Sequence, residues 1–199
     1  YRPGSLGAAL ADGEIVHYPV TVPLPTTERP TVVTLHDLQH LEQPGSFSGA
    51  KRRFRRRNYD DAARNADHVI AISEWVRERA ITLLSLDPER VHVAHHGVEG
   101  HWLESPVEPP EREPFLLYPA RGWTHKNHAR LFEAFALLRV LRPGLRLVLT
   151  GGGHRWRSLP EGIESRGQVD DATLRDLYRR ASALVFPSLY EGFGLPPLE

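Results

Sequence analysis

The chain of 199 residues lacks cysteine and methionine, and its formal net charge is zero. Without cysteine there is no disulfide framework, no thiol nucleophile and no thiolate-bound metal. The balanced charge gives no overall attraction to nucleic acid or to an anionic surface. No apolar run approaches the length of a membrane-spanning helix, and no signal peptide is recognisable. These absences favour a cytoplasmic protein.

Short apolar runs alternate with helical patterns along the chain. In the first half, runs typical of strands lie at residues 15–18, 31–35, 68–72 and 91–95. Helical patterns there cover about 51–66 and 74–84. In the second half, strands are expected at 115–118, 145–150 and 184–186, and helices at about 127–141 and 170–181. This alternation predicts parallel strands joined by crossover helices, and therefore an α/β fold.

Residues 105–114 are rich in proline and charge and cannot build a core, so they are predicted to be a linker between domains. The linker separates the remainder of an N-terminal Rossmann-like domain, 1–104, from the first part of a C-terminal one, 115–199. Methionine is missing even at position 1, and the sequence stops just inside a motif that should open a helix. We therefore expect a segment of a longer protein, incomplete at both ends and inactive by itself.

The last stretch, PSLYEGFGLPPLE at residues 187–199, places two acids on either side of a glycine-rich turn. Gly192 and Gly194 allow the backbone to approach a ligand closely, because no Cβ stands in the way. A helix that begins near Pro196 would direct free N–H groups at an anion. Carboxylates for hydroxyls beside amides for phosphate predict a sugar-nucleotide pocket. The alternative is a strand-to-helix loop with solvated acids.

The segment from Glu191 to Glu199 resembles the E-x7-E signature of retaining glycosyltransferases of family GT4. This resemblance implies a GT-B fold, with two Rossmann-like domains facing a cleft, and sugar transfer from a nucleotide-diphosphate sugar without any cofactor or metal. It makes Glu191 a catalytic-site candidate that contacts hydroxyls of the donor sugar, while Glu199 accepts hydrogen bonds from the ribose. The remaining donor contacts that it implies are Gly192, Phe193, Gly194 and Leu195.

A second motif, YPARGWTHKNH at residues 118–128, joins a strand end to a helix start, where phosphate is favoured. Arg121 and Lys126 add two cations, and Lys126 is one of only two lysines in the chain. The segment is similar to the family's basic loop, in which an arginine and a lysine five residues later hold the donor pyrophosphate. Ala120 stands where the family more usually has glycine. The alternative is an ordinary loop with solvated cations.

Three weaker segments join these motifs. The glycines at 151–153 either allow close approach of a ligand or form a flexible turn. Gly167 and Val169 lie where GT-B enzymes pack against the donor base, although a plain strand-to-helix connection explains them equally well. His36, followed by Asp37, resembles the family's His-Asp segment beside the donor sugar and is the second catalytic candidate. Its alternative is a turn in which Asp37 caps and His36 packs.

The only dense basic run is Lys51-Arg-Arg-Phe-Arg-Arg-Arg57. It could meet an anionic lipid head group, a phosphorylated acceptor or nucleic acid. A solvated helix face, balanced by Asp60 and Asp61, is the preferred interpretation, with peripheral membrane contact as the alternative. Nucleic acid is not expected, because no RNA-binding aromatic motif accompanies the run. Nor is a metal expected, since strand geometry would keep the histidines of residues 92–101 from converging.

Together these motifs predict a transferase that moves a sugar from a nucleotide-diphosphate donor to a carbohydrate, lipid-linked or small-molecule acceptor. The cations and loop amides would stabilise the leaving pyrophosphate. A paired-carboxylate glycoside hydrolase is one alternative, although a glycosidase has no pyrophosphate to neutralise. A non-catalytic nucleotide-sugar-binding relic or scaffold is the other, because the family's early glycine-rich loop is missing from this sequence.

Overall fold

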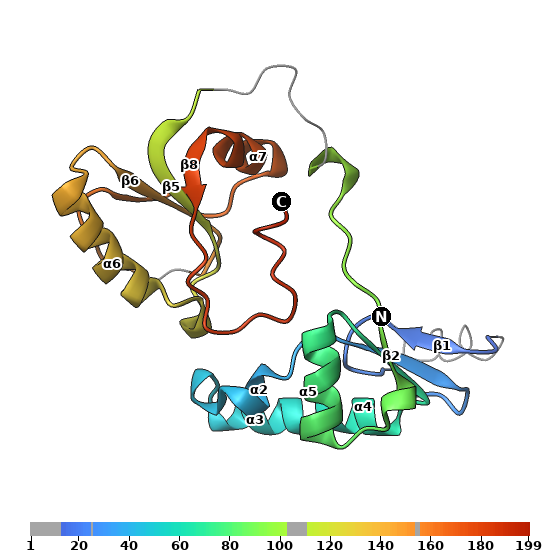
Figure 1. The fold of residues 1–199 in the computed structure, drawn as a ribbon. Helices are drawn as coiled ribbons and strands as arrows, with labels where there is room; N and C mark the ends of the chain where they lie inside the picture. The colour runs from blue at the N-terminus through green and yellow to red at the C-terminus, as the bar shows by residue number, and fades with distance from the viewer. Residues whose placement is uncertain (1–12, 25, 103–110, 154–155) are drawn as a thin grey trace. The chain divides into compact units, whose positions relative to one another are not determined.

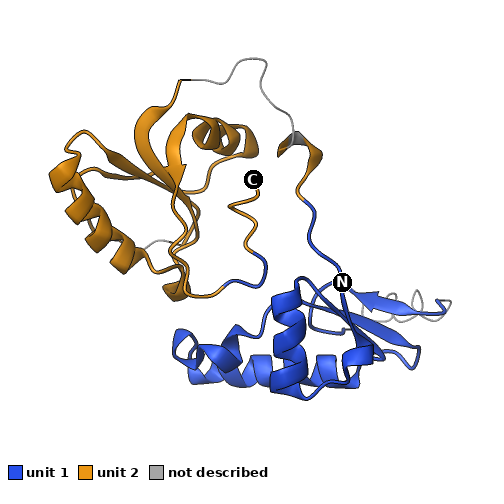
Figure 2. Ribbon diagram, viewed as in Figure 1, with its two compact units in different colours: residues 1–97, 191–193 blue, residues 98–190, 194–199 orange. Residues whose placement is uncertain are grey.

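The computed structural model describes residues 13–24, 26–102, 111–153 and 156–199 (Figure 1). Contacts divide the chain into two compact units (Figure 2). Unit 1 contains Tyr1–Gly97 with Glu191–Phe193, and unit 2 contains Val98–Tyr190 with Gly194–Glu199. The first crossing between the units lies at Gly97 and Val98. Most of the predicted linker falls outside the described residues, but its last two positions, Glu113 and Pro114, are strand residues.

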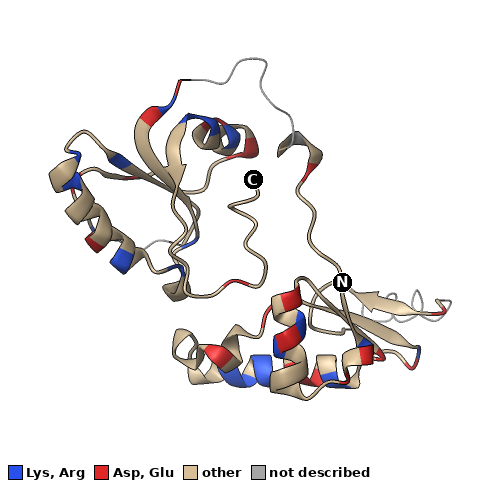
Figure 3. Cartoon of the chain, in the orientation of Figure 1, with Lys and Arg blue, Asp and Glu red and all other residues tan. Residues whose placement is uncertain are grey.

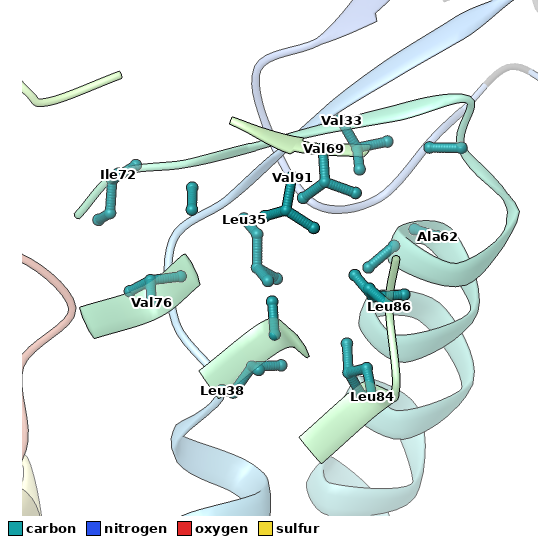
Figure 4. Close-up of a cluster of buried hydrophobic side chains, with 14 of the residues drawn as sticks. Val33, Leu35, Leu38, Ala62, Val69, Ile72, Val76, Leu84, Leu86 and Val91 are labelled. Carbon is teal, nitrogen blue, oxygen red and sulfur yellow. The ribbon is translucent and has the colours of Figure 1, made fainter. Parts of the chain in front are cut away.

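Unit 1 is built on four parallel strands in sequential order, β1-β2-β3-β4. The strands are β1 (Val16–Tyr18), β2 (Thr31–Leu35), β3 (His68–Ala71) and β4 (Val91–Val93). In register, Val33 lies opposite Val69, which lies opposite Val91. These three side chains are buried and pack with helix residues into one apolar core (Figure 4). β-Branched residues suit this pleated, buried surface, which explains why the apolar runs form strands.

The helices of unit 1 follow local capping signals. The α-helices are α2 (Gln39–Glu42), α3 (Gly49–Arg55), α4 (Asp61–Asn65) and α5 (Glu74–Leu84), with 3-10 turns η1 (Pro44–Ser46) and η3 (Pro88–Arg90). Ser73 caps α5, because its Oγ accepts a hydrogen bond from the N–H of Val76. The prediction for α5 is confirmed at both ends, whereas α2 was not predicted.

The helix predicted over 51–66 is interrupted by a π-helical turn, η2 (Arg56–Asp60). On an α-helix, residues five apart differ by about 140° in direction, whereas a π-turn brings them toward one side. Arg55 and Asp60, five residues apart, both contact the segment 37–40. Arg55 Nη2 donates to Asp37 Oδ2 at 2.9 Å, and Asp60 Oδ1 lies 2.7 Å from His40 Nε2. Asp60 and His40 are buried. Asp60 therefore does not balance the basic run at the surface, which corrects the sequence interpretation.

Unit 2 has four parallel strands in the order β7-β6-β5-β8. They are β5 (Glu113–Pro119), β6 (Arg146–Thr150), β7 (Ile163–Ser165) and β8 (Ala181–Leu184). The chain winds outward from β5 to β7 and then returns to the other side of β5. That reversal is a topological switch point, where open α/β sheets bind ligands beyond the carboxyl ends of their strands.

Helices cover both faces of the unit 2 sheet. They are α6 (His128–Leu141) and α7 (Asp171–Arg180), with 3-10 turns η4 (Gly100–Trp102) and η5 (Thr124–Lys126). In Figure 1, α6 and α7 lie on opposite sides of the sheet. Leu131 and Phe135 of α6 pack with Tyr118 on one face, whereas Leu177 of α7 packs with Leu117 on the other. The neighbours on β5 thus alternate between the two cores, as strand geometry requires.

In unit 2, one strand prediction is wrong and one strand has no prediction. β8 begins at Ala181, directly after α7, and not at residue 184. Its position follows from pairing, since Ala181 lies opposite Glu113 and Leu184 opposite Leu117. β7 was not predicted at all.

In the described part of the chain, no helix is both long and apolar enough to traverse a bilayer.

Candidate functional site

A hollow of about 180 Å³ lies in unit 2, where the loops after β5, β6 and β7 meet. Arg121, Val169 and Glu199 line it, so three of the predicted site residues come together within one unit. The other lining residues are Pro119, Ala120, Thr150, Gly151, Gln168 and Leu174. The hollow therefore lies at the carboxyl edge of the sheet, the edge that parallel α/β folds use for ligands.

Backbone hydrogen bonds tie the loops around this hollow to one another. The N–H of Ala120 donates to Thr150 O at 3.0 Å, and the N–H of Gly151 donates to Gly167 O at 2.7 Å. A further bond joins the N–H of Gly122 to Gly152 O at 3.1 Å. The three loops thus form a connected backbone layer, in which Gly167 has a structural role.

Gly151 allows two of these loops to touch. Its φ is +107°, and a Cβ at this position would lie 2.6 Å from Ala120 O. Of the two interpretations of the triple glycine, Gly151 therefore supports close approach, but the partner is the chain itself. Gly153 also has a positive φ, +83°, yet a Cβ there would meet nothing within 4 Å.

The two predicted cations differ in their placement. Arg121 is exposed, lines the hollow and holds its guanidinium carbon 5.5 Å from the ring centre of Trp123. Lys126 is half-buried at the end of η5 and is not among the described residues that line the hollow. Its carbonyl oxygen accepts a hydrogen bond from the Tyr118 hydroxyl at 2.6 Å. The structure therefore brings Arg121, but not Lys126, to the hollow.

The basic loop is attached to the stretch that precedes Glu191. Asn127 adopts a left-handed conformation, φ 59° and ψ 35°, and its side-chain amide donates to Pro187 O at 3.1 Å. The N–H of Leu189 donates to His125 O at 2.8 Å. Because Asn127 tolerates this conformation better than most residues, it can turn the chain into α6 while holding the second loop.

At the end of the chain, Glu199 lies on a hydrogen-bonded turn. The N–H groups of Leu198 and Glu199 donate to Leu195 O at 2.8 and 3.2 Å, the pattern of a first helical turn. Gly194 precedes this turn with φ +87°. The Tyr178 hydroxyl lies 3.2 Å from Glu199 Oε2 and 2.9 Å from Pro196 O. Burial and the charge of Glu199 raise the pKa of Tyr178, so its hydroxyl stays protonated.

The remaining predicted residues belong to unit 1. Gly192 packs against the backbone of His36, and the Ser73 hydroxyl donates to Gly192 O at 2.6 Å. The His36 Nε2 lies 2.9 Å from Pro19 O, a carbonyl that can only accept, so Nε2 carries a proton. His36 stacks on His96 at 5.5 Å, and Phe193 meets His96 edge-on at 5.4 Å. Burial and the nearby His36 lower the pKa of His96.

Asp37 has a structural role in a turn, which was the alternative to a role in the site. Its Oδ1 accepts a hydrogen bond from the N–H of Gln39 at 3.0 Å, while Oδ2 pairs with Arg55. Among the described residues, no group of three or more histidine, aspartate or glutamate side chains could hold a metal ion. The predicted site thus falls into two groups. Unit 1 holds His36 with Glu191, Gly192 and Phe193, and the rest lie in unit 2.

Sequence reasoning missed four residues near the unit 2 hollow: Thr150, Gln168, Leu174 and Tyr178. Two of them have a signal in the sequence, since Thr150 directly precedes the glycines at 151–153 and Gln168 lies between Gly167 and Val169. Leu174 and Tyr178 lie on α7, whose amphipathic pattern gives no sign of a ligand. Their role follows only from the tertiary structure.

Parallel sheets, with Arg121 and Glu199 at the carboxyl edge of one of them, are typical of nucleotide-binding α/β proteins. Two protein families match the chain. The family Glycosyltransferase Family 4 matches residues 12–100, and Glycosyl transferases group 1 matches residues 103–199. The chain belongs to the GT4-type glycosyltransferases of the GT-B fold.

Similar proteins include the O-antigen chain mannosyltransferase RfbU of Salmonella typhimurium, which is 25% identical over 90% of this chain and 50% of that protein. A glycogen synthase of Mycobacterium tuberculosis is 27% identical over 85% of this chain and 44% of its own length. The structure of Anabaena Alr3699/HepE in complex with UDP and glucose superimposes with a TM-score of 0.67 at 16% identity, covering 94% of this chain and 55% of that one. The chain thus spans about half the length of these proteins.

Proposed function

We propose that the protein transfers a hexosyl group from a nucleotide-diphosphate sugar to an acceptor, with retention of the anomeric configuration. The observation that carries the proposal is the unit 2 hollow, where Arg121 and Glu199 line one small space at the ligand edge of the sheet. A cation for phosphate and a carboxylate for hydroxyls are what a nucleotide sugar requires. The fold shared with a protein solved with UDP and glucose supports the same donor class.

The chemical difficulty in this reaction is the leaving pyrophosphate, which gains negative charge as the glycosidic bond breaks. In our proposal Arg121, Lys126 and the N–H groups from Gly194 onward stabilise that charge electrostatically, and no metal is required. Glu199 accepts hydrogen bonds from the ribose hydroxyls, and the base packs beside Val169. His36 and Glu191 are assigned to the donor sugar because their segments resemble the family's motifs. No protein nucleophile is assigned.

The proposal includes a peripheral contact with an anionic membrane through residues 51–57. Figure 3 shows basic residues gathered along α3. Five basic side chains of this run are exposed: Lys51, Arg52, Arg53, Arg56 and Arg57. Phe54 between them is 55% exposed, and the nearby Asp60 is buried. Basic residues near a membrane surface each add about 1 kcal/mol of attraction to anionic lipid.

Donor use is tested by incubating the full-length protein with a panel of UDP-, GDP- and dTDP-sugars and measuring nucleotide release. NMR of the product then gives its anomeric configuration. Lys126→Ala should lower turnover by about 100- to 1,000-fold, the size expected for loss of one electrostatic contact to developing charge. Lys51→Ala, at the only other lysine, is the matched control and should retain turnover on a soluble acceptor.

Three outcomes would contradict the assignment. Unchanged turnover in Lys126→Ala would remove Lys126 from the mechanism. Hydrolysis of a plain glycoside without nucleotide would favour the glycosidase alternative, and nucleotide binding without release would favour the non-catalytic one. For the membrane contact, sedimentation with phosphatidylglycerol vesicles should exceed that with phosphatidylcholine vesicles and should weaken as salt rises. Equal sedimentation with both would refute it.

A further inference from the structure

Tyr178 connects α7 to the turn that carries Glu199. It lies in the last turn of α7 (Asp171–Arg180), and its ring meets Trp102 of η4 edge-on at a centroid distance of 5.3 Å. Its hydroxyl lies within hydrogen-bonding distance of both Pro196 O and Glu199 Oε2, at 2.9 and 3.2 Å. The residue therefore contacts the backbone and the carboxylate of one short turn at the same time.

This double contact limits where the Glu199 carboxylate can lie. A glutamate side chain has three rotatable bonds, and a contact to Oε2 removes much of that freedom. The Pro196 carbonyl shares the same hydroxyl, so the carboxylate is fixed relative to the backbone turn that begins at Leu195. A ligand hydroxyl can then be accepted at the other oxygen, Oε1, without an ordering cost at the moment of binding.

The tyrosine itself is held in place. Its ring packs on Trp102 and joins the core that contains Leu177. Arg112 Nη1 also bonds the carbonyl of Ala181, three residues further along the chain, which fixes the end of α7. Because burial and the Glu199 charge raise the pKa of Tyr178, the hydroxyl keeps its single proton at neutral pH, and the Pro196 carbonyl and the Glu199 carboxylate share that proton.

We propose that Tyr178 is a positioning residue that orients Glu199 toward the ribose hydroxyls of a nucleoside diphosphate. The inference rests on the proposed function, since it needs a ribonucleotide in the unit 2 hollow. Tyr178 does not line that hollow, so it acts through Glu199 and not by its own contact with the ligand.

The test compares two ligands that differ only in the groups Glu199 should accept. Isothermal titration calorimetry on the full-length protein measures Kd for UDP and for 2′,3′-dideoxy-UDP, or for the matching pair of whichever nucleoside diphosphate binds best. Tyr178→Phe keeps the ring on Trp102 and removes only the hydroxyl. It should weaken UDP binding by about tenfold, the size of one ordered hydrogen bond to a charged group, and leave dideoxy-UDP binding unchanged.

Four further variants sharpen the comparison. Glu199→Gln should lose the same discrimination, and the Tyr178→Phe/Glu199→Gln double variant should lose no more than Glu199→Gln alone, because the two side chains act together. Glu199→Asp withdraws the carboxylate from the hydroxyl without touching α7 and should show the same selective loss. Tyr118→Phe removes a hydroxyl that contacts the basic loop, so it should weaken both ligands equally.

The outcomes separate the two proposals. If the unaltered protein binds no nucleoside diphosphate, the proposed function fails. If it binds UDP more tightly than dideoxy-UDP but Tyr178→Phe weakens both ligands equally, or neither, the positioning role is overturned. With a donor substrate, the expected signature is a raised KM at unchanged kcat, since the contact to ribose is present in both the ground state and the transition state.

Discussion

Replacing Gly151 by alanine would place a methyl group where β6 leaves the sheet and passes the loop after β5. The new Cβ would lie 2.6 Å from Ala120 O, 2.8 Å from Ala120 C and 3.1 Å from Arg121 N. All three are backbone atoms, so no side chain can rotate away. The loop cannot simply retreat either, because the Ala120 N–H is bonded to Thr150 O, one residue before the substitution.

Two costs add at this position. The φ of +107° is one that residues with a Cβ rarely adopt, and such strain costs about 1–3 kcal/mol. Forcing backbone atoms apart in a packed region costs about a further 1–3 kcal/mol. The free energy of unfolding of unit 2 should therefore fall by about 2–6 kcal/mol, a large part of the ~5–15 kcal/mol typical of a domain.

Two other glycines of unit 2 separate these costs. Gly153→Ala meets nothing within 4 Å but has φ +83°, so it should lose only the strain of about 1–3 kcal/mol. Gly144→Ala meets nothing within 4 Å and has no positive φ, so its effect should lie within about 1 kcal/mol of zero. The difference in the free energy of unfolding between Gly151→Ala and Gly153→Ala therefore measures the steric cost alone.

Urea unfolding followed by tryptophan fluorescence measures these values in a Trp75→Phe background. The other tryptophans, at 102, 123 and 156, all belong to unit 2. Each variant is then titrated with nucleoside diphosphate, and only Gly151→Ala should lose affinity, because only it displaces Ala120 and Arg121. Equal destabilisation by Gly151→Ala and Gly153→Ala would refute the reasoning.

Three further predictions concern unit 1. Asp60→Ala leaves the buried Nε2 of His40 without its partner and should lower the free energy of unfolding of unit 1 by about 1–3 kcal/mol. Asp61→Ala, at the exposed neighbour, should change it by less than about 0.5 kcal/mol. Both values come from urea titrations that follow Trp75 fluorescence in a background with the three unit 2 tryptophans replaced by phenylalanine. Ser73→Ala removes the α5 cap and the bond to Gly192 O, and a loss of about 0.5–2 kcal/mol is expected in the same assay, so no loss would contradict the capping role. The folded state lowers the pKa of His96, so this imidazole binds a proton more readily in the unfolded chain. The free energy of unfolding of unit 1 should therefore fall as pH drops through the ordinary histidine pKa of about 6.5. His96→Gln should make the free energy of unfolding depend less on pH than it does in the unaltered chain.

The elements that could be predicted from sequence are those that local chemistry determines. β2 is a β-branched run that any sheet would accept, and α5 begins where Ser73 provides a cap. Asp170 does the same for α7, since its Oδ1 accepts a hydrogen bond from the N–H of Thr173 at 2.8 Å. In each case the determining contact lies within a few residues of the element.

The elements that were missed depend on partners elsewhere in the chain. β7 has only three residues, Ile163–Ser165, and is a strand because Ile163 pairs with Leu147 of β6. β8 starts before the apolar run because Arg112 and Ser182 bond across the first residues of β5 and β8. Tyr178 could not be predicted for the same reason. Helix α7 shows only amphipathic periodicity, and the contact between Tyr178 and Glu199 joins residues 21 positions apart.

Gly192 is constrained in the structure by contacts that its sequence pattern does not reveal. From sequence alone, the missing side chain of Gly192 predicts close approach of the backbone to a ligand. In the structure a Cβ at position 192 would lie 2.1 Å from His36 O, and the Ser73 hydroxyl holds Gly192 O from the other direction. The glycine is therefore required by the backbone of unit 1 itself. Gly194, two residues later, is required for a different reason, its φ of +87°. The two glycines of one motif thus satisfy separate constraints, a close backbone contact in unit 1 and a left-handed turn in unit 2, neither of which involves a ligand.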